Sequence, residues 1–302
     1  MAFQKGQAPP EYNPQLPVIY TGWSGYRVQE FTYSMAVDID KCGFYTRSTR
    51  IEGLQPILES AGFKFGDCIE TAIREHYERG IDPVDVFNVE WGKWKDVNLM
   101  YREREEDWNN LLQVGRGLLR QFPKVRETLF PFTNLKFSLH PVKQNWYRGS
   151  GLGYILDGVA HEPGEDVLID FKTSGNKYDD NQDHQGWPML DPQLRVGALV
   201  TGIRKVAFLT AVKTKNPYWQ FIEGRVTDEL LRDTDLWLRE MYDRYVEQKF
   251  YRRAGMRFPS EHCKMCDVLP KCLGRDDLVK LTLRQKTKRE TDAAVAVLDE
   301  MD

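Results

Sequence analysis

Two aspartates and a lysine in the middle of the chain have the residue types and spacing of a site for a hard divalent cation. The apolar runs Tyr154–Leu156 and Val167–Ile169 are each followed by an aspartate, Asp157 and Asp170. A Pro-Gly turn between the runs predicts a β-hairpin. Asp170 and Lys172 are two residues apart, so on a strand their side chains leave the same face, where a carboxylate of the neighbouring strand can join them.

Carboxylates beside a lysine suit phosphodiester cleavage with Mg²⁺ or Mn²⁺. Such a cation polarises the phosphate and lowers the pKa of a bound water. An ammonium group can position that water or stabilise the developing charge. The competing interpretation is a surface hairpin with solvated acids, because an Asp-x-Lys triplet also occurs by chance. The triplet alone leaves both interpretations open.

Three cysteines near the C-terminus form a second group with recognisable chemistry. Cys263, Cys266 and Cys272 follow the spacing C-x2-C-x5-C, and closely spaced cysteines in an intracellular chain usually bind metal. A four-coordinate centre needs one more ligand. We predict Cys42, next to a helix end, because Cys68 lies within an amphipathic helix, where a buried free thiol is expected. Thiolates suit Zn²⁺ and an iron–sulfur cluster equally well, so the spacing does not choose between them.

Composition sets the broad class of protein. The 302 residues, 41% hydrophobic and 12% aromatic, are enough for a sizeable core in one large domain or two small ones. The net charge is −3, so any nucleic-acid site must be a local patch. The sequence has no apolar signal core, no apolar run long enough to span a bilayer, and an odd number of cysteines. These features predict a cytoplasmic protein with no membrane contact.

Apolar periodicity and capping signals predict the elements that position these residues. Residues 1–30 are expected to form an extended arm. The predicted helices are a short one capped by Ser34 and ending near Cys42, Lys64–Arg79, Tyr101–Phe122 ended by Pro123, Pro192–Thr201 and Thr227–Glu247. The predicted strands are Asn134–Val142, the two arms of the hairpin, Val206–Lys213 and Tyr218–Arg225. A polar segment, Gly175–Asp191, is expected to be either a mobile loop beside the site or a plain surface loop. This order predicts an α/β fold with a central mixed sheet flanked by helices.

Taken together, the motifs resemble RecB-type nucleases of the PD-(D/E)XK, restriction-endonuclease-like superfamily. The resemblance is to the iron–sulfur branch, which includes CRISPR-adaptation exonucleases and the nuclease domains of the AddB and Dna-two helicases. The similar segments, in order, are YSMAVDIDKCGFY, FGDCIETAIREHYE, GYILDGV, VLIDFKTS, DPQLRVGALV and CKMCDVLPKC. They cover about residues 31–273, predicted to be the nuclease domain, and leave residues 274–302 as a C-terminal helix or flexible tail.

The resemblance implies roles for the site residues. Asp157 and Asp170 would hold Mg²⁺ or Mn²⁺, the carbonyl of Phe171 would add a ligand, Lys172 would aid the water, and Gln193 would order the site. It also implies a [4Fe-4S] cluster that clasps the N- and C-terminal segments. The ligands of that cluster would be Cys42, Cys263, Cys266 and Cys272.

Three positions depart from the family pattern. Glu70 stands where the family has a metal-binding histidine, and a carboxylate is a good ligand for a hard cation. Gly43 replaces a proline after the first cysteine, which we expect to be a mild change. Gly197 replaces a tyrosine four residues after Gln193, which would alter the grip on substrate.

The implied function is that of an Mg²⁺- or Mn²⁺-dependent deoxyribonuclease. It would be an exonuclease acting on single-stranded DNA or DNA ends, in phage or bacterial recombination, repair or CRISPR adaptation. The chain has no GxxxxGK[ST] motif, so a helicase or recombination protein would be a separate partner; the oligomeric state is left open. Trp146, Tyr147 and Trp187 are candidates for stacking on bases. The competing interpretation, a place in the core or at its rim, is the more common state of any one such aromatic residue. The alternative is a non-catalytic DNA-binding or assembly protein with a structural iron–sulfur or zinc centre.

Overall fold

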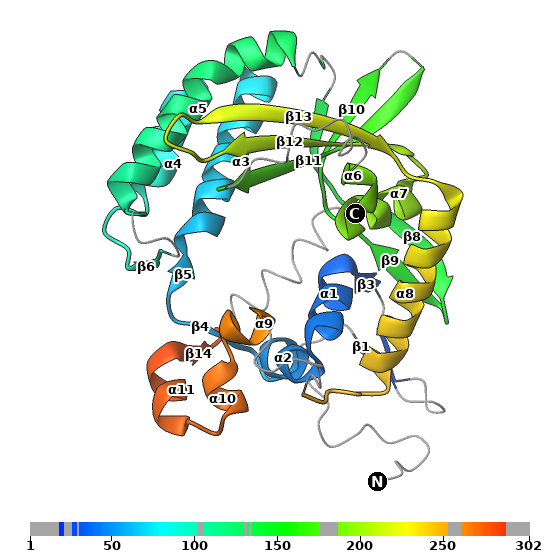
Figure 1. The fold of residues 1–302 in the computed structure, drawn as a ribbon. Helices are drawn as coiled ribbons and strands as arrows, with labels where there is room; N and C mark the ends of the chain where they lie inside the picture. Colours follow the sequence, from blue (N-terminus) through cyan, green and yellow to red (C-terminus); the bar gives the residue numbers. More distant parts are fainter. Residues whose placement is uncertain are drawn as a thin grey trace. The chain divides into compact units, whose positions relative to one another are not determined.

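The computed structural model describes residues 18–20, 26–28, 30–101, 106–129, 132, 135–162, 164–175, 187–252 and 261–287 (Figure 1). The chain divides into two compact units. We call residues 58–139 and 155–232 the hairpin unit, and residues 1–57, 140–154 and 233–302 the cysteine unit. The predicted domain boundaries at residues 30 and 273 stay predictions. None of the helices within the described ranges is long and apolar enough to cross a membrane.

The hairpin unit is built on a mixed sheet with strand order β13-β12-β11-β10-β7. Strands β10 (Leu156–Glu162) and β11 (Glu165–Ser174) form the predicted antiparallel hairpin, whose ladder extends to Glu162 opposite Glu165. The connection between the two strands is therefore shorter than the turn His161–Asp166 that the sequence indicates. Strand β11 runs parallel to β12 (Lys205–Val212), which pairs antiparallel with β13 (Tyr218–Arg225). On the other side, β7 (Leu135–Leu139) pairs antiparallel with β10. The prediction of a mixed sheet is confirmed.

The parallel pairing of β11 with β12 requires a crossover connection. Helices α6 (Trp187–Leu190) and α7 (Pro192–Thr201) lie in that connection, and α7 has the predicted bounds. Asp191 caps α7, because its carboxylate accepts hydrogen bonds from the main-chain N–H groups of Gln193 and Leu194. This cap holds Gln193 in the first turn of the helix.

Three helices of the hairpin unit pack with the sheet around one core: α3 (Ala61–Arg79), α4 (Pro83–Gly92) and α5 (Trp108–Thr128). Helix α3 ends before Gly80, as predicted, at a φ of +68° that glycine adopts readily. The prediction that Pro123 ends α5 is wrong. Phe122 and Val125 on either side of the proline are buried, and their burial offsets the hydrogen bond that proline cannot donate. The short strands β5 (Glu59–Ser60) and β6 (Leu99–Met100) pair in parallel.

In the cysteine unit, β3 (Glu30–Thr32), β9 (Ser150–Gly153) and β8 (Val142–Tyr147) form a small sheet. Most of α8 (Asp228–Val246), which matches the predicted long helix, belongs to the same unit. Within this unit Phe31 lies parallel to Trp146, at 6.1 Å between ring centroids, and edge-on to Tyr242. The indole of Trp146 is 7% exposed and donates to Asp235 at 2.6 Å. Trp146 is therefore a core residue and not a stacking surface for bases, in agreement with the more common of the two states expected for a single aromatic residue.

The first N-terminal helix ends beside Cys42, as predicted, and differs from the prediction at its start. Helix α1 (Tyr33–Lys41) is capped by Thr32 rather than Ser34, because the Thr32 hydroxyl accepts from the N–H of Met35. Gly43 does not end the helical region; it begins α2 (Gly43–Thr46), which continues into a π-helix, η1 (Arg47–Ile51). The predicted arm lies mostly outside the described residues, apart from β1 (Val18–Tyr20) and β2 (Tyr26–Val28), which pair antiparallel.

The C-terminal segment of the cysteine unit contains α9 (Glu261–Lys264), α10 (Leu269–Cys272), α11 (Asp276–Thr282) and β14 (Leu283–Gln285). Strand β14 pairs antiparallel with β4 (Leu54–Pro56), and Leu54, Val268 and Leu283 form a small buried cluster. The C-terminal segment is thus joined by main-chain pairing to a segment that follows α1 and α2 in the sequence.

Candidate functional site

The hairpin brings the two predicted aspartates together. The ladder places Gly158 opposite Ile169, so Asp157 and Asp170 are the next opposing positions. Asp170 is 1% exposed, and one Asp157 oxygen, Oδ2, accepts a hydrogen bond of 3.0 Å from the N–H of Phe171. The pairing of β10 with β11 is therefore sufficient to gather both carboxylates, as the apolar runs predicted.

Lys172 is held between two of the other predicted residues. Its Nζ lies 2.6 Å from Oδ2 of Asp170 and donates a hydrogen bond of 2.9 Å to Oε1 of Gln193. Burial lowers the pKa of Lys172, but the neighbouring Asp170 outweighs that effect, so the net shift is upward. The ammonium group is thus protonated and fixed in position by β11 and the first turn of α7.

The environment of Asp170 suits an additional cation. Burial raises the pKa of its carboxyl well above the ordinary value, Lys172 opposes this rise, and Asp157 adds to it. Its Oδ1 atom is buried and accepts no hydrogen bond from any described residue. A buried carboxylate oxygen without a partner is energetically unfavourable. Oxygen ligands of this kind are those that Mg²⁺ and Mn²⁺ prefer, so the donor chemistry fits such a cation.

Glu70 reaches the same region from α3. Burial raises the pKa of its carboxyl to about 7, with Asp157 as the next cause, while Arg74 lowers it. One turn earlier, a Cβ added to Gly66 would lie 3.3 Å from Oγ1 of Thr173 on β11. The absence of a side chain at Gly66 lets α3 come close to β11, and this approach brings Glu70 to the hairpin. The role of Glu70 as a metal ligand stays a prediction.

The described side chains do not form a finished metal centre. Among them, no three His, Cys, Asp or Glu residues are gathered closely enough to hold a metal ion as they stand. The ligand set that includes Glu70, Asp157, Asp170 and the carbonyl of Phe171 therefore also stays a prediction.

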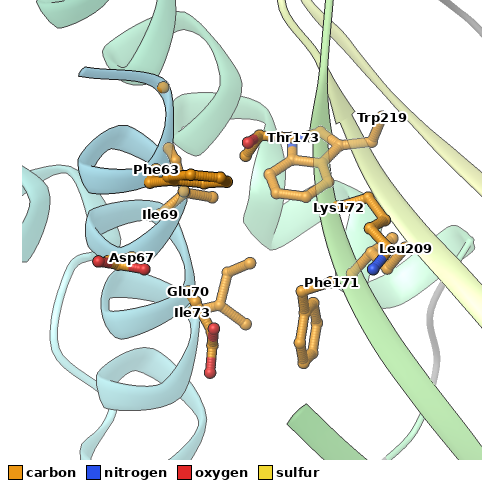
Figure 2. Close-up of a pocket in the computed structure, with 12 residues that line it drawn as sticks. Phe63, Asp67, Ile69, Glu70, Ile73, Phe171, Lys172, Thr173, Leu209 and Trp219 are labelled. Carbon is orange, nitrogen blue, oxygen red and sulfur yellow. The ribbon is translucent and has the colours of Figure 1, made fainter. Parts of the chain in front are cut away.

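A cavity of about 230 Å³ lies between α3 and the strands β11, β12 and β13 (Figure 2). Glu70 borders it on the α3 side, and Phe171 and Thr173 border it on the β11 side. Sequence reasoning missed two of its aromatic residues, Phe63 and Trp219. Phe63 lies before the predicted start of α3, at Lys64, whereas the helix begins at Ala61.

The four cysteines predicted to bind a cluster all belong to the cysteine unit. Each of them is half-buried, none of the chain's five cysteines forms a disulfide, and Cys68 is buried in the hairpin unit. Burial, with smaller contributions from the neighbouring Cys42, Asp267 and Cys263, raises the pKa of the Cys266 thiol to about 11, against the opposing effect of a main-chain hydrogen bond with Val268. Cys42 therefore lies near Cys266, and four thiols from one unit are the donor set that a cysteine-ligated cluster requires.

Gly43, next to Cys42, has a structural role that the sequence did not reveal. A Cβ at this position would lie 2.8 Å from the carbonyl oxygen of Lys249 and 2.8 Å from Cα of Phe250. The next residue, Phe44, donates its N–H to the carbonyl of Tyr251 at 3.1 Å. Position 43 therefore requires glycine in this structure, because residues 249–251 occupy the space that a side chain would need.

No family model and no curated protein matches this chain. Among solved structures, the protein SSO0001 aligns with 12% identity over 82% of this chain and 88% of its own, with a TM-score of 0.38. A candidate exonuclease from Eubacterium rectale aligns with 11% identity over 78% of this chain and 92% of its own, with a TM-score of 0.47. LHK-Exo in complex with dAMP aligns with 10% identity over 70% of this chain and 98% of its own, with a TM-score of 0.26. Similarities this distant assign neither fold nor activity to this chain.

Proposed function

We propose that the hairpin unit carries the active site of an Mg²⁺- or Mn²⁺-dependent deoxyribonuclease, an exonuclease that acts on single-stranded DNA or DNA ends. The observation that carries this proposal is the arrangement at Asp170: an ion pair of 2.6 Å with Lys172 on one oxygen, and no hydrogen-bond partner among the described residues for the other. The proposal includes the resemblance to RecB-type nucleases of the PD-(D/E)XK superfamily, with a separate helicase or recombination protein as partner.

Each residue of the proposed site would have a separate role. Asp157 and Asp170, with Glu70 and the Phe171 carbonyl, would hold the cation. When bound, the cation would polarise the phosphate and make a water molecule more acidic. The hydrogen bond from the Phe171 N–H fixes the direction of the Asp157 carboxylate.

Lys172 supplies a positive charge at a fixed place. Because Asp170 and Gln193 both hold its Nζ, little reorganisation is needed to bring that charge to a phosphate oxygen or an attacking water. Gln193 acts through Lys172 and is a positioning residue. Its own position comes from the cap that Asp191 provides to α7.

We also propose that Cys42, Cys263, Cys266 and Cys272 hold a [4Fe-4S] cluster of structural function. The C-terminal segment that carries three of these cysteines is already joined to the chain after α2 by the β4–β14 ladder. A cluster binding only the folded state would stabilise this arrangement further.

The test is digestion of end-labelled single-stranded and double-stranded DNA with Mg²⁺ and with Mn²⁺. Lys172→Ala should reduce the rate by at least about 100-fold, the usual effect of removing one preorganised charge-stabilising group. Lys136→Ala, which changes an exposed lysine on β7 of the same sheet, is the matched control and should leave the rate unchanged.

The alternative, a non-catalytic DNA-binding or assembly protein, predicts a different outcome. Wild-type protein would bind DNA but would not cut it with either cation. Equal digestion by wild type and Lys172→Ala would also contradict the proposal, because the activity would then come from elsewhere.

A further inference from the structure

The cavity beside α3 is lined by both apolar and polar side chains, with an exposed aromatic residue at its edge. The apolar side chains that border it are Phe63, Ile69, Ile73, Phe171, Leu209 and Trp219. Of these, Ile69, Ile73, Leu209 and Trp219 are at most 6% exposed, whereas Phe63 is 69% exposed. Such a lining favours a flat apolar ring, and Phe63 stands where a ring could enter or stack.

The polar groups around the cavity come from two elements. Asp67 and Glu70 belong to α3, and Lys172 and Thr173 belong to β11. Figure 2 shows Phe171 and Thr173 on the α3 side of β11, with the side chain of Lys172 on the other side, as alternation along a strand requires. The cavity therefore combines an apolar interior with carboxylate and hydroxyl groups that can accept or donate hydrogen bonds to the edge of a heterocycle.

The cavity adjoins the proposed cleavage site, because Lys172 and Glu70 both border it. Phe171 forms part of its wall, and the N–H of the same residue donates to Asp157. Glu70 borders the cavity as well and is one of the proposed ligands of the cation. A nucleotide whose phosphate lies at Asp157 and Asp170 would thus have its sugar and base within reach of the cavity.

We propose that this cavity binds one unpaired nucleobase of the strand being cut, in contact with Phe63 and Trp219. This inference rests on the proposed function and specifies its substrate. At about 230 Å³ the cavity is smaller than the roughly 300–1,000 Å³ of pockets for drug-sized ligands, so it accommodates a single base and not a base pair. The nucleotide next to the cut must then be unpaired, which favours single-stranded or frayed ends.

The first experiment measures binding without cleavage. The probes are a deoxynucleoside monophosphate and deoxyribose 5-phosphate, which lacks the base, titrated separately against the full chain while tryptophan fluorescence is recorded. The nucleotide should bind more tightly than the sugar phosphate, and Phe63→Ala should weaken nucleotide binding about tenfold, the usual order for losing one base–aromatic contact. Val89→Ala is the matched control, since Val89 is also exposed, at 65%, but lies on α4.

The outcomes decide the proposal in either direction. Weaker binding to Phe63→Ala, with Val89→Ala like wild type, supports it. Equal affinity for the two probes, absence of nucleotide binding, or a Phe63→Ala variant that binds like wild type overturns it. Because Phe63 is largely exposed, its replacement should not unfold the protein, and the thermal unfolding of both variants checks this.

A second experiment separates this inference from the proposed nuclease activity. Single-stranded oligonucleotides with a normal or an abasic terminal residue are digested by wild type and Phe63→Ala. If wild type cuts the normal end faster and Phe63→Ala removes that preference, both the activity and the base site are supported. If both ends are cut at equal rates, the activity stands and the base site falls. If nothing is cut, the proposed function falls, and the binding titration still decides the base site.

Discussion

Replacing Glu70 by glutamine should make the metal-free protein more stable at alkaline pH. Burial and the nearby Asp157 raise the pKa of the Glu70 carboxyl from 4.5 to about 7. The folded state therefore holds the proton more tightly than the unfolded state does. Stability associated with this group is present below pH 4.5 and is lost as the pH rises through about 7. Glutamine resembles the protonated carboxyl but does not titrate, so this position in the variant adds no pH dependence to the stability.

The size of the effect follows from the pKa. A rise from 4.5 to about 7 corresponds to at most about 3 kcal/mol of unfolding free energy once both states are ionised. Wild type and Glu70→Gln should thus have nearly the same stability at about pH 4.5, the ordinary pKa of the group. At about pH 8.5 the variant should be more stable by up to about 3 kcal/mol.

The assay is urea unfolding in the presence of a chelator at a series of pH values, with Glu78→Gln as the control. Glu78 is an exposed residue of the same helix, so its replacement should give a stability difference that does not change with pH. A difference between wild type and Glu70→Gln that stays constant from about pH 4.5 to about pH 8.5 would refute the reasoning, because Glu70 would then not lie in a buried, negatively charged site.

The same samples test whether Glu70 contacts the cation. Saturating Mg²⁺ at alkaline pH should stabilise wild type more than Glu70→Gln, because a ligand that binds only the folded state adds to its stability. The cleavage rate of Glu70→Gln should respond more weakly to Mg²⁺, and Glu70→His should recover activity preferentially with Mn²⁺. Identical Mg²⁺ titrations for the three proteins would leave Asp157, Asp170 and the Phe171 carbonyl as the ligands.

The remaining predictions concern the other site residues and the cysteines. Asp170→Asn keeps a polar group beside Lys172 but removes a charge from the cation site, so it should abolish cleavage while circular dichroism shows an unchanged fold. Gln193→Ala removes one of the two contacts that hold Lys172 and should lower kcat about tenfold with little change in KM, whereas Gln193→Glu should restore the contact and part of the rate. Cys42→Ala should lose the iron and sulfide of anaerobically purified protein, and Cys68→Ala should keep about four of each; stoichiometric zinc without iron in the wild type would decide for a zinc centre.

Local sequence signals predicted the parts of the site that are close together in the chain. The hairpin followed from two short apolar runs and a Pro-Gly turn, and the pairing of β10 with β11 alone brings Asp157 beside Asp170. Helix α7 followed from a proline at the first helical position, and the structure adds Asp191 as its N-cap. Because these signals involve neighbouring residues, their structural result needs little information from the rest of the fold.

Features that depend on packing could not be predicted in the same way. Pro123 is a helix-breaking signal, yet the burial of Phe122 and Val125 keeps α5 intact. A tryptophan can lie in a core or form a base-stacking surface. Only the contacts of Trp146 with Phe31 and Asp235 show that it lies in the core. Likewise, Gly43 could be recognised as essential only once the chain at Lys249 was known to pass beside it.

The position of Glu70 shows where helical periodicity stops being informative. The spacing of apolar residues in α3 places Glu70 beside the buried stripe, but it does not say what that stripe faces. The small size of Gly66 lets α3 lie close to Thr173 on β11, so the stripe faces the sheet. A helix from one part of the chain thereby supplies a carboxylate to a hairpin that lies far along the sequence.

The site that results is unfavourable without a cation and therefore coupled to its binding. Glu70, Asp157 and Asp170 place three carboxyl groups near one lysine, and both Glu70 and Asp170 have pKa values raised chiefly by burial, with Asp157 adding to each. This cost is part of the folded state, because the hairpin and the capped helix α7 hold the groups in place whether or not a cation is present. A divalent cation that bound the carboxylates would relieve the repulsion, so the same charges that reduce the stability of the metal-free protein would increase its affinity for Mg²⁺ or Mn²⁺.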